Sequence, residues 1–382
     1  MMAEPAGIVS LGPVSGPRHA SFAAACERFG MPVRTIGWNA FLADPAILDS
    51  ALHPGAYLRF DTPDQDIASI AALYCAGEAT ALEKGIETLP QGSEARLAQG
   101  DIGSPAQLAF GLAAAVDVAS RIAQRHGAHV STNAEEVACS FDKTATLQRL
   151  REAGVPIPRY MLPFTSFETL AHVMEAIPRP RLFVKLRYGS AAAGMIALAR
   201  HGNQWRAITT AEPYADGIRA TRNLRRLDSF AQIAQLIDRL SPLGLHAETW
   251  LPKIGIDGRV ADVRLVMLAD GTIFPVLRTS RHPMTNLHLG GTRGPVEPLI
   301  RRIGADHWEA ILASARKAAR CFPASHVLGI DVAILADGRS HALLEVNVFG
   351  DFVKEVTVGG LTPHEAQVSQ ISAILARQRE AA

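Results

Sequence analysis

The stretch GIDVAILADGRSHALLEVNVFGDF, residues 329–352, decides the fold. Apolar and polar residues alternate on both sides of an Asp-Gly pair, a favoured hairpin turn, so two antiparallel strands are predicted. Asp331 then lies on one strand, while Glu345 and Asn347, two residues apart, share one face of the other. These oxygen donors suit Mg²⁺, which keeps water and substrate phosphates in its remaining positions. Polar residues in so apolar a strand favour a metal site over the alternative, a half-exposed hairpin whose polar residues face water.

A second stretch, LFVKLRYGSAAAGMIAL at residues 182–198, places one lysine in an apolar strand. Lys185 stands between two apolar residues, and a charge at such a position favours a functional role over a solvated surface role. The segment is either a hairpin whose apolar residues fill a core or a turn that holds phosphate. The two interpretations are compatible, because the strands can carry Lys185 while the turn from Gly189 to Gly194 forms a lid.

The composition is that of a globular protein. The chain has 382 residues, 48% hydrophobic and 20% charged, and its 38 basic and 37 acidic residues give a net charge of +1. This length predicts two or three domains, and the charge balance predicts no attraction to nucleic acid or to an anionic membrane. The start has no basic region and Asp117 interrupts the most apolar segment, so we expect a cytoplasmic protein without a membrane span. The cysteines include no CxxC pair and the histidines no HExxH motif, which favours neither a disulfide framework nor a zinc site.

The N-terminal third is predicted to form an α/β domain. Residues 7–36 have the pattern of a strand, a helix and a strand, which is a βαβ unit. The following strand, AYLRFD, ends in Arg59 and Asp61, and ligands gather at the carboxyl ends of parallel strands, so both are substrate-site candidates. A long helix with Ser104 as its N-cap, running to about Arg125, is expected to pack its alanine-rich face on the sheet.

Residues 133–154, NAEEVACSFDKTATLQRLREAG, are predicted to form one helix. Asn133 is the expected N-cap, and Glu136 is expected to complete a capping box with it. The prolines that follow Gly154 keep the next segment extended. Further along, two Asp-Gly turns predict hairpins, which makes the C-terminal half an antiparallel sheet with helices.

Four arginines cluster between residues 214 and 229. Their spacing suits a helix or a loop, and a solvated run of charge is the simpler interpretation. The alternative is a docking patch for an acidic peptide or a phosphorylated substrate. The four residues are Arg219, Arg222, Arg225 and Arg226.

The segment DVAILADGRSHALLEVN resembles the metal-binding hairpin of the ATP-grasp superfamily, especially its glutathione-synthetase and ribosomal-protein glutamate-ligase branch. The resemblance continues in family order over residues 133–351. FDKTATLQRLREAGVPIPR is similar to the segment with the first phosphate lysine, and FVKLRYG to the strand with the second. AETWL resembles the interdomain hinge, ADVRLVML the Asp-x-Arg strand, and RTSRHPMTNLHLGG the Arg-to-Asn-Leu-His-x-Gly-Gly element.

This resemblance implies an α/β (α+β) fold in three parts: an N-terminal domain of residues 1–132, a central subdomain of residues 133–247 and a C-terminal subdomain of residues 248–382. ATP would lie between the last two with two Mg²⁺ ions, or with Mn²⁺. The nucleotide contacts implied are Lys143, Lys185, Gly189, Ser190, Glu248, Thr249, Trp250, Leu251 and Asp262. Catalytic roles are implied for Arg264, Arg278 and Asn286, with Gly290 and Gly291 nearby, and metal ligation for Asp331, Glu345 and Asn347.

The activity implied by the resemblance is ADP-forming ligation of a carboxylate to an amine through an acyl phosphate, on a small molecule or a peptide. Such an enzyme neutralises phosphate charge and fixes geometry rather than supplying a covalent nucleophile. Two alternatives stay open. One is a phosphotransferase, in which a hydroxyl keeps the phosphate, and the other is a nucleotide-binding regulatory protein without turnover. A homo-oligomer is compatible with the sequence.

Three features depart from the family pattern. Ala191 to Ala193 stand where the loop commonly has glycine, so we expect a stiffer lid with fewer backbone amides at positive φ. Met284 and Leu289 stand where the closest branch tends to have arginines. Asp351, in the altered ending EVNVFGDF, is either a turn residue or a substrate contact.

Overall fold

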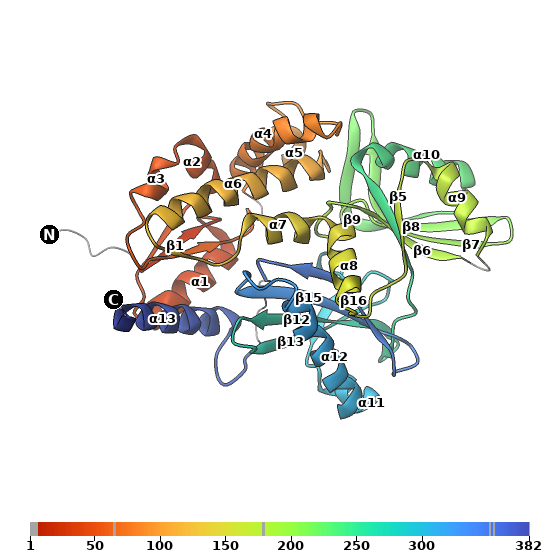
Figure 1. The fold of residues 1–382 in the computed structure, drawn as a ribbon. Helices are drawn as coiled ribbons and strands as arrows, with labels where there is room; N and C mark the ends of the chain where they lie inside the picture. The colour runs from red at the N-terminus through yellow and green to blue at the C-terminus, as the bar shows by residue number, and fades with distance from the viewer. Residues whose placement is uncertain (1–6, 64–65, 178–179, 351–352, 354–355, 382) are drawn as a thin grey trace.

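The computed structural model describes residues 7–63, 66–177, 180–350, 353 and 356–381, so Asp351 lies outside the described residues. Three β-sheets follow one another along the chain, and helices pack against each of them (Figure 1). In Figure 1 the N-terminal part is red to orange, the central sheet is green, and the C-terminal sheet, in teal and blue, lies below them. The predicted α/β fold class is confirmed.

The N-terminal sheet is parallel, as the βαβ pattern predicts, with the strand order β2-β1-β3-β4. Strands β1 and β3 are buried along their whole length, which is typical of a parallel sheet covered by helices on both faces. The strands are β1 (Ile8–Leu11), β2 (Val33–Ile36), β3 (Tyr57–Phe60) and β4 (His129–Val130). The helices of this part are α1 (Gly16–Arg28), α2 (Trp38–Ala43), α3 (Ala46–Asp49), α4 (Ile67–Glu83), α5 (Glu94–Ala98) and α6 (Pro105–Arg125).

Helix α6 packs its alanine-rich face on this sheet, as predicted. Ala115 and Ala119 belong to the same buried cluster as Leu58 of β3. By length and composition α6 is apolar enough to cross a membrane, contrary to the expectation drawn from Asp117. Its most apolar window is 56% buried inside the protein, and a core helix passes the same test.

Two glycines allow α4 and α6 to approach each other closely. A Cβ atom on Gly77 would lie 1.9 Å from the carbonyl oxygen of Gln107, and one on Gly111 would lie 1.8 Å from the carbonyl oxygen of Leu73. A larger residue at either position would have to push the two helices apart.

Residues 133–154 form two helices rather than the single predicted one. They are α7 (Ala134–Phe141) and α8 (Lys143–Glu152). Asp142 separates them because its side chain accepts hydrogen bonds from the backbone N–H groups of Thr144 and Ala145 and so caps the second helix. Lys143 therefore stands at the first position of α8.

Two predicted capping interactions are replaced by longer-range contacts. Asn133 caps α7 as expected, by accepting from the N–H of Glu136. The Glu136 carboxylate does not complete a capping box but accepts from the hydroxyl of Ser325. Ser104 precedes α6, yet its hydroxyl donates to the carbonyl of Glu87 instead of capping the helix. Both side chains instead form hydrogen bonds with other segments of the chain.

The central sheet is antiparallel, with the order β5-β10-β6-β7-β8-β9, and the predicted hairpin around Lys185 is its β6-β7 pair. Helices α9 and α10 share its core on one face. The strands are β5 (Tyr160–Phe164), β6 (Arg181–Leu186), β7 (Ile196–His201), β8 (Gln204–Tyr214), β9 (Gly217–Leu227) and β10 (Leu245–Thr249). The helices are α9 (Phe167–Glu175), α10 (Phe230–Leu240) and the 3₁₀ turn η1 (Ser241–Leu243).

The arginine cluster lies on β9, the edge strand of the central sheet, and not in a helix or loop as expected. Strand β9 pairs with β8 along its length, but the register shifts between Thr209 and Ala211. Such a shift breaks the two-residue alternation by which a strand is recognised in a sequence. On β9 the shift falls between Ala220 and Arg225, so residues 221–224 interrupt the alternation.

The C-terminal sheet contains both predicted hairpins, in the order β14-β13-β12-β15-β16, with β11 paired to β12. Across the β15-β16 pair, Asp331 stands opposite Glu345 and Gly329 opposite Asn347. The strands are β11 (Gly255–Ile256), β12 (Arg259–Leu268), β13 (Ile273–Ser280), β14 (Thr292–Gly294), β15 (Val327–Ile334) and β16 (His341–Asn347). The helices are α11 (Glu297–Ile303), α12 (Ala305–Ala319) and the 3₁₀ turn η2 (Leu287–Leu289).

The last helix, α13 (Pro363–Ala381), returns to the N-terminal sheet. Figure 1 shows it in dark blue beside the red helix α1. Val368, Ile371 and Leu375 share a buried cluster with Ile8 and Tyr57. The two ends of the described chain thus complete one hydrophobic core.

Candidate active site

Residues from the N-terminal part, the central sheet and the C-terminal sheet line one cavity of about 520 Å³. Arg18 and Thr62 come from the N-terminal part, Lys185 from β6, and Asp331 from β15. The predicted site residues that line it are Lys143, Lys185, Gly189, Ser190, Glu248, Thr249, Leu251, Asp262, Arg264, Arg278, Asn286, Asp331, Glu345 and Asn347. Segments spread over 200 residues of sequence therefore meet in one place.

Asp142 positions Lys143 relative to the end of β6. Its carboxylate accepts from Arg187 Nε at 2.8 Å and Nη2 at 2.5 Å, and from the Tyr188 hydroxyl at 3.1 Å. The backbone N–H of Lys143 also donates to the carbonyl of Arg187 at 3.0 Å. Because Arg187 follows Lys185 by two residues, this cluster fixes the starts of the two lysine side chains relative to each other. Burial would raise the pKa of Asp142, but the bonds from Arg187 outweigh it and hold the pKa below its usual range.

Lys185 and Glu248 form a buried ion pair. Lys185 Nζ donates to Glu248 Oε2 at 2.6 Å, and His246 Nε2 lies 2.9 Å from Glu248 Oε1. Burial alone would raise the pKa of Glu248, but the charge of Lys185 and the bond from His246 lower it to about 2. Burial in turn lowers the pKa of His246. Glu248 therefore orients the lysine, in addition to facing the cavity.

Two arginines face Asp331 on the opposite wall. Asp331 Oδ1 lies 2.6 Å from Arg264 Nε and 3.0 Å from Arg278 Nη2, and Oδ2 accepts from Arg264 Nη2 at 3.3 Å. Burial raises the pKa of Asp331, and the two arginines only partly offset it. Despite these close cations, Oδ1 accepts no hydrogen bond from any residue that the structure describes.

Asp262 and Lys253 extend this wall. Asp262 Oδ1 accepts from Arg278 Nε at 2.9 Å, and its Oδ2 lies 2.7 Å from Lys253 Nζ and accepts from the Thr285 hydroxyl. Burial would raise the pKa of Asp262, but Arg278 and Lys253 hold it well below its usual range. With its oxygens bound in this way, Asp262 orients Arg278.

Glu345 and Asn347 bring the hairpin toward Lys143. Lys143 Nζ, at the start of α8, donates to Glu345 Oε1 of β16 at 3.1 Å. Burial would raise the pKa of Glu345, but Lys143 and Arg264 lower it. In the amide orientation that gives both side-chain atoms of Asn347 a partner, its nitrogen donates to Glu345 Oε1 at 3.3 Å. Its oxygen then accepts from Arg264 Nη1 at 3.0 Å.

The hairpin residues fit a hard divalent cation. Two carboxylates and one amide carbonyl are the oxygen donors that Mg²⁺ prefers, and Asp331 Oδ1 is a buried acceptor without a hydrogen bond. Over the described residues, no group of three or more His, Cys, Asp or Glu side chains could hold a metal. The fit therefore depends on the amide of Asn347 and on oxygens from outside the protein.

The loop over the cavity contains two residues in the left-handed conformation. Ala191 and Ala192 have φ values of 50° and 61°, so the expectation that alanines would avoid positive φ is wrong. The buried Thr210 holds them there: its hydroxyl donates to the Ala192 carbonyl at 2.6 Å and accepts from the Met195 N–H at 3.0 Å. Left-handed alanine costs about 1–2 kcal/mol, which these contacts must offset.

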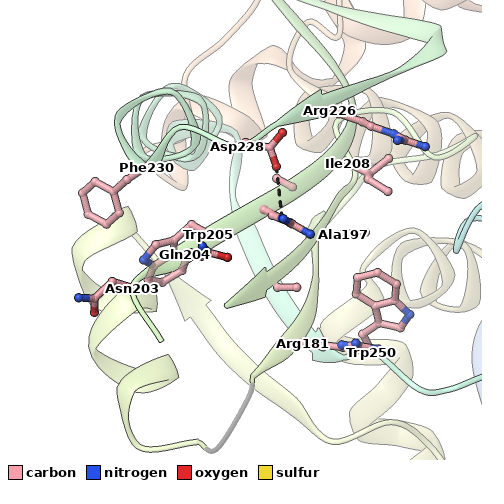
Figure 2. Close-up of a pocket in the computed structure, with 13 residues that line it drawn as sticks. Arg181, Ala197, Asn203, Gln204, Trp205, Ile208, Arg226, Asp228, Phe230 and Trp250 are labelled. Atoms are coloured by element: carbon pink, nitrogen blue, oxygen red, sulfur yellow. Dashed lines mark ion pairs between the residues drawn. The ribbon is translucent and has the colours of Figure 1, made fainter. Parts of the chain in front are cut away.

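Trp250 points away from this cavity. Figure 2 shows its ring beside Arg181 in a second hollow, of about 770 Å³, with Arg226 at the far side. The ring lies 5.3 Å from the Phe183 ring and 5.7 Å from the Arg181 guanidinium carbon. Among the residues that line this second hollow are no lysine and no facing pair of carboxylates, so we assign the candidate site to the smaller cavity.

Solved structures with a similar fold match nearly the whole chain. The ATP-grasp ligase PsnB complexed with a minimal precursor matches 98% of this chain and 99% of its own, with a TM-score of 0.54 and 15% identity. The macrocyclase MdnC bound to the precursor peptide MdnA, from Microcystis aeruginosa MRC, matches 96% and 99%, with a TM-score of 0.54 and 10% identity. D-alanine–D-alanine ligase from Bacillus anthracis complexed with ATP matches 97% and 96%, with a TM-score of 0.50 and 10% identity.

The chain has the ATP-grasp fold. The sequence itself matches no family model and no curated protein. The ATP-grasp fold expected from the short motifs is therefore confirmed.

Several residues of this candidate site were missed by the sequence motifs. Asp142 and Arg187 adjoin the two lysines, and His246 and Lys253 complete the ion-pair networks behind Glu248 and Asp262. Two of them had a readable signal, because Asp142 is a good N-cap residue and His246 lies two residues from Glu248 on one face of a strand. The other two had no such signal: Arg187 bonds to Asp142 across 45 residues, and Lys253 bonds to Asp262 across nine.

Asn286 is placed at the cavity by its own backbone. Its side chain accepts from the N–H of His288 at 2.9 Å and caps the turn η2. Gly291 follows this turn closely, since a Cβ there would lie 2.8 Å from the carbonyl oxygen of Thr285. Met284 and Leu289, which stand where arginines were expected, are buried and pack with Phe183.

Proposed function

We propose that this protein is an ATP-dependent ligase that joins a carboxylate to an amine, with an amino acid or a peptide as substrate. A carboxylate oxygen attacks the γ-phosphorus of ATP, and ADP leaves. The amine nitrogen then attacks the acyl carbon, the bond to the phosphate oxygen breaks, and inorganic phosphate and an amide are formed. This is carbon–nitrogen bond formation with ADP as a product.

One observation carries the proposal: two lysines, two arginines and the oxygen donors of the hairpin converge on one cavity in an ATP-grasp fold. The chemistry needs cations around a transferring phosphoryl group and fixed geometry, and this set supplies both. PsnB and MdnC were solved with precursor peptides, and D-alanine–D-alanine ligase with ATP, which supports a peptide or amino-acid substrate and ATP here.

We assign the following roles within the site. Lys143 and Lys185 bind the nucleotide phosphates, under the loop that includes Gly189 and Ser190. Arg264 and Arg278 bind the acyl phosphate and the tetrahedral species through planar paired donors. Asp262 holds Arg278 in place, and Asn286 supplies an amide at the reacting carbonyl.

The remaining roles concern adenine and metal. The backbone of Thr249 to Leu251, with Glu248 at its start, binds adenine, while the ring of Trp250 packs on the far side of the hinge. Asp331, Glu345 and Asn347 would hold Mg²⁺, which neutralises phosphate charge when bound. We also propose the three-part division at residues 132 and 247, in which the phosphate lysines and the metal hairpin belong to different subdomains.

The test is to incubate the protein with ATP, Mg²⁺ and pools of acids, amines and peptides. We expect release of ADP and phosphate and, by mass spectrometry, a product heavier than its substrate by an amide condensation. Reproducible release of AMP and pyrophosphate would contradict the mechanism. A stable phosphorylated product without an amide would support a phosphotransferase, and tight ATP binding without turnover in every pool would support a regulatory protein.

A further inference from the structure

The N-terminal end of the cavity contains a buried cluster of charges that the proposed chemistry does not use. Asp61 follows β3, and its carboxylate lies 2.6 Å from Arg18 Nε and 2.7 Å from Arg59 Nη2. Its Oδ1 also accepts from the N–H of Thr62 at 2.9 Å. The side chains of Arg18, Arg59 and Asp61 are 8%, 5% and 2% exposed.

This cluster stands at the topological switch point of the parallel sheet. In the order β2-β1-β3-β4 the chain leaves β1 toward one side and β3 toward the other, which opens a crevice at their carboxyl ends. Arg18 lies in the first turn of the helix after β1, and Asp61 directly after β3. Arg18 and Thr62 line the cavity that also holds the lysines and the hairpin.

The cluster is joined directly to the metal hairpin. Arg18 Nη2 donates to the carbonyl of Phe349 at 2.7 Å, two residues after Asn347. Phe349 lines the same cavity. A group bound at Arg18 would therefore lie next to the end of the hairpin.

The charges in the cluster do not balance. Arg18 and Arg59 carry two positive charges against the one negative charge of Asp61, and no other carboxylate pairs with either arginine within the described part of the chain. Burial and the charges of Arg59 and Arg18 lower the pKa of His364 to about 3, so this neighbour stays neutral and adds no charge. A buried positive excess is costly unless an anion accompanies it.

We propose that the crevice at Arg18 binds a carboxylate of the substrate other than the reacting one, such as the α-carboxylate of an amino acid or the C-terminal carboxylate of a peptide. A guanidinium matches a planar carboxylate with two parallel N–H donors, and it is always charged. Arg18 is the binding group, while Asp61 and Arg59 hold its orientation. This inference deepens the proposed function by naming a second charged group on the substrate.

The experiment compares three variants by thermal unfolding and by calorimetry, with saturating MgADP, using acetate and glutarate as probes and chloride at equal ionic strength as the blank. We expect Arg18→Gln to weaken carboxylate binding by about tenfold or more. Asp61→Asn raises the local positive excess, so it should unfold more readily than the wild type and recover more of its stability when acetate is added. Arg28→Gln, an exposed arginine on the same helix, is the matched control and should bind as the wild type does.

Several results would overturn the proposal. A folded Arg18→Gln protein with wild-type affinity for glutarate would mean that the cluster is only structural. Tighter Arg18-dependent binding of inorganic phosphate than of acetate would contradict the carboxylate assignment. If Arg18→Gln does not fold, Arg18→Lys keeps the charge but loses the planar pair of donors, and unchanged carboxylate affinity in that variant would also contradict the proposal. MgADP binding is measured separately, so loss of nucleotide binding in the wild type would count against the ligase function and not against this crevice.

Discussion

Two walls of the cavity each contain a buried carboxylate, Glu248 or Asp331, and the pKa values of these two groups shift in opposite directions. We call the wall with Lys185, Glu248 and His246 the lysine wall and the wall with Asp331, Glu345 and Asn347 the hairpin wall. On the lysine wall, Glu248 Oε2 accepts a hydrogen bond from Lys185 Nζ at 2.6 Å, and Oε1 lies 2.9 Å from His246 Nε2. These contacts lower the pKa of Glu248 to about 2. On the hairpin wall, Asp331 faces two arginines within 3.0 Å, yet burial raises its pKa. The difference lies in the neighbours: Glu248 is bonded by Lys185 and His246, whereas the carboxylates of Glu345 and Asp262 add to the effect of burial on Asp331.

This contrast indicates that the two walls of the cavity have different tasks. The lysine wall is a closed network that folding alone completes, so it fixes where Lys185 stands. On the hairpin wall, Asp331 lies beside two arginines and shares the cavity with Glu345 and Asn347, the other oxygen donors. We infer that the lysine wall contributes mainly to stability and nucleotide affinity, and the hairpin wall mainly to turnover. Each variant below tests one side of this division.

The largest effect is expected on the hairpin wall. Glu345→Ala removes an oxygen donor of the hairpin and the partner of Lys143, and it should lower kcat by about 100- to 1000-fold. Stability should change less, because Glu345 is only partly buried. Steady-state ADP release measures kcat, and Asp337→Ala in the exposed turn of the same hairpin is the control. Unchanged turnover in Glu345→Ala would remove the basis for the metal assignment.

A stability effect is expected on the lysine wall. Glu248→Gln leaves the buried Lys185 without a charged partner, and it should lower the free energy of unfolding by about 3 kcal/mol at neutral pH. Urea denaturation measures this value, and Glu309→Gln, from an exposed pair with Arg316, should cost less than about 1 kcal/mol.

The same variant predicts a pH dependence. The pKa of Glu248 is lowered in the folded protein from 4.5 to about 2, so its stabilisation is fully present above pH 4.5 and is lost as the pH falls toward 2. The difference in unfolding free energy between the wild type and Glu248→Gln should therefore shrink over that interval. A difference that stays constant from pH 6 to pH 2.5 would show that the ion pair does not stabilise the fold.

A smaller effect is expected at Asp142, which positions the two lysines relative to each other. Asp142→Asn keeps a capping oxygen for Thr144 but loses the charged pair with Arg187, so the two lysines should be held less firmly. We expect the KM for ATP to rise by about tenfold with little change in kcat. Asp66→Asn, at the N-cap of α4, is the control for a lost carboxylate cap. If kcat fell and KM stayed constant, Asp142 would not act by positioning the lysines.

The smallest effect is expected in the loop. Ala192→Gly removes the strain of an alanine in the left-handed conformation, but it also makes the unfolded chain more flexible. The first effect is larger, so the free energy of unfolding should rise by about 0.5 kcal/mol. Ala193→Gly, the next residue but without a positive φ, should lower it by a similar amount. Thermal unfolding of both variants is the measurement. Unchanged ATP affinity and turnover in Ala192→Gly would mean that the loop packs without acting on the nucleotide.

Local patterns in the sequence predicted the parts of the site that depend on local geometry. Asp331, Glu345 and Asn347 were placed by the alternation of one hairpin, and Lys185 by its position in an apolar strand. What the patterns missed depends on tertiary contacts. Arg187 and Lys253 look like ordinary surface cations until Asp142 and Asp262 are seen beside them.

The errors in secondary structure have a similar origin. The helical pattern continues across Asp142, so only its side-chain capping divides α7 from α8. The register shift beside β9 conceals a strand among arginines. The direction of the Trp250 side chain, away from the cavity, depends on which face of the sheet the hinge leaves, and the sequence alone does not specify it.

Helix α13 has a consequence for synthesis of the protein. The core between α1 and the first sheet, around Ile8 and Phe22, is finished by Val368 and Leu375. A ribosome makes the N-terminal part first, but this side of it cannot be buried until residues 363–375 have emerged. Until then the nascent chain exposes an apolar surface that chaperones recognise, and shortening the protein at its C-terminus would leave that surface open permanently.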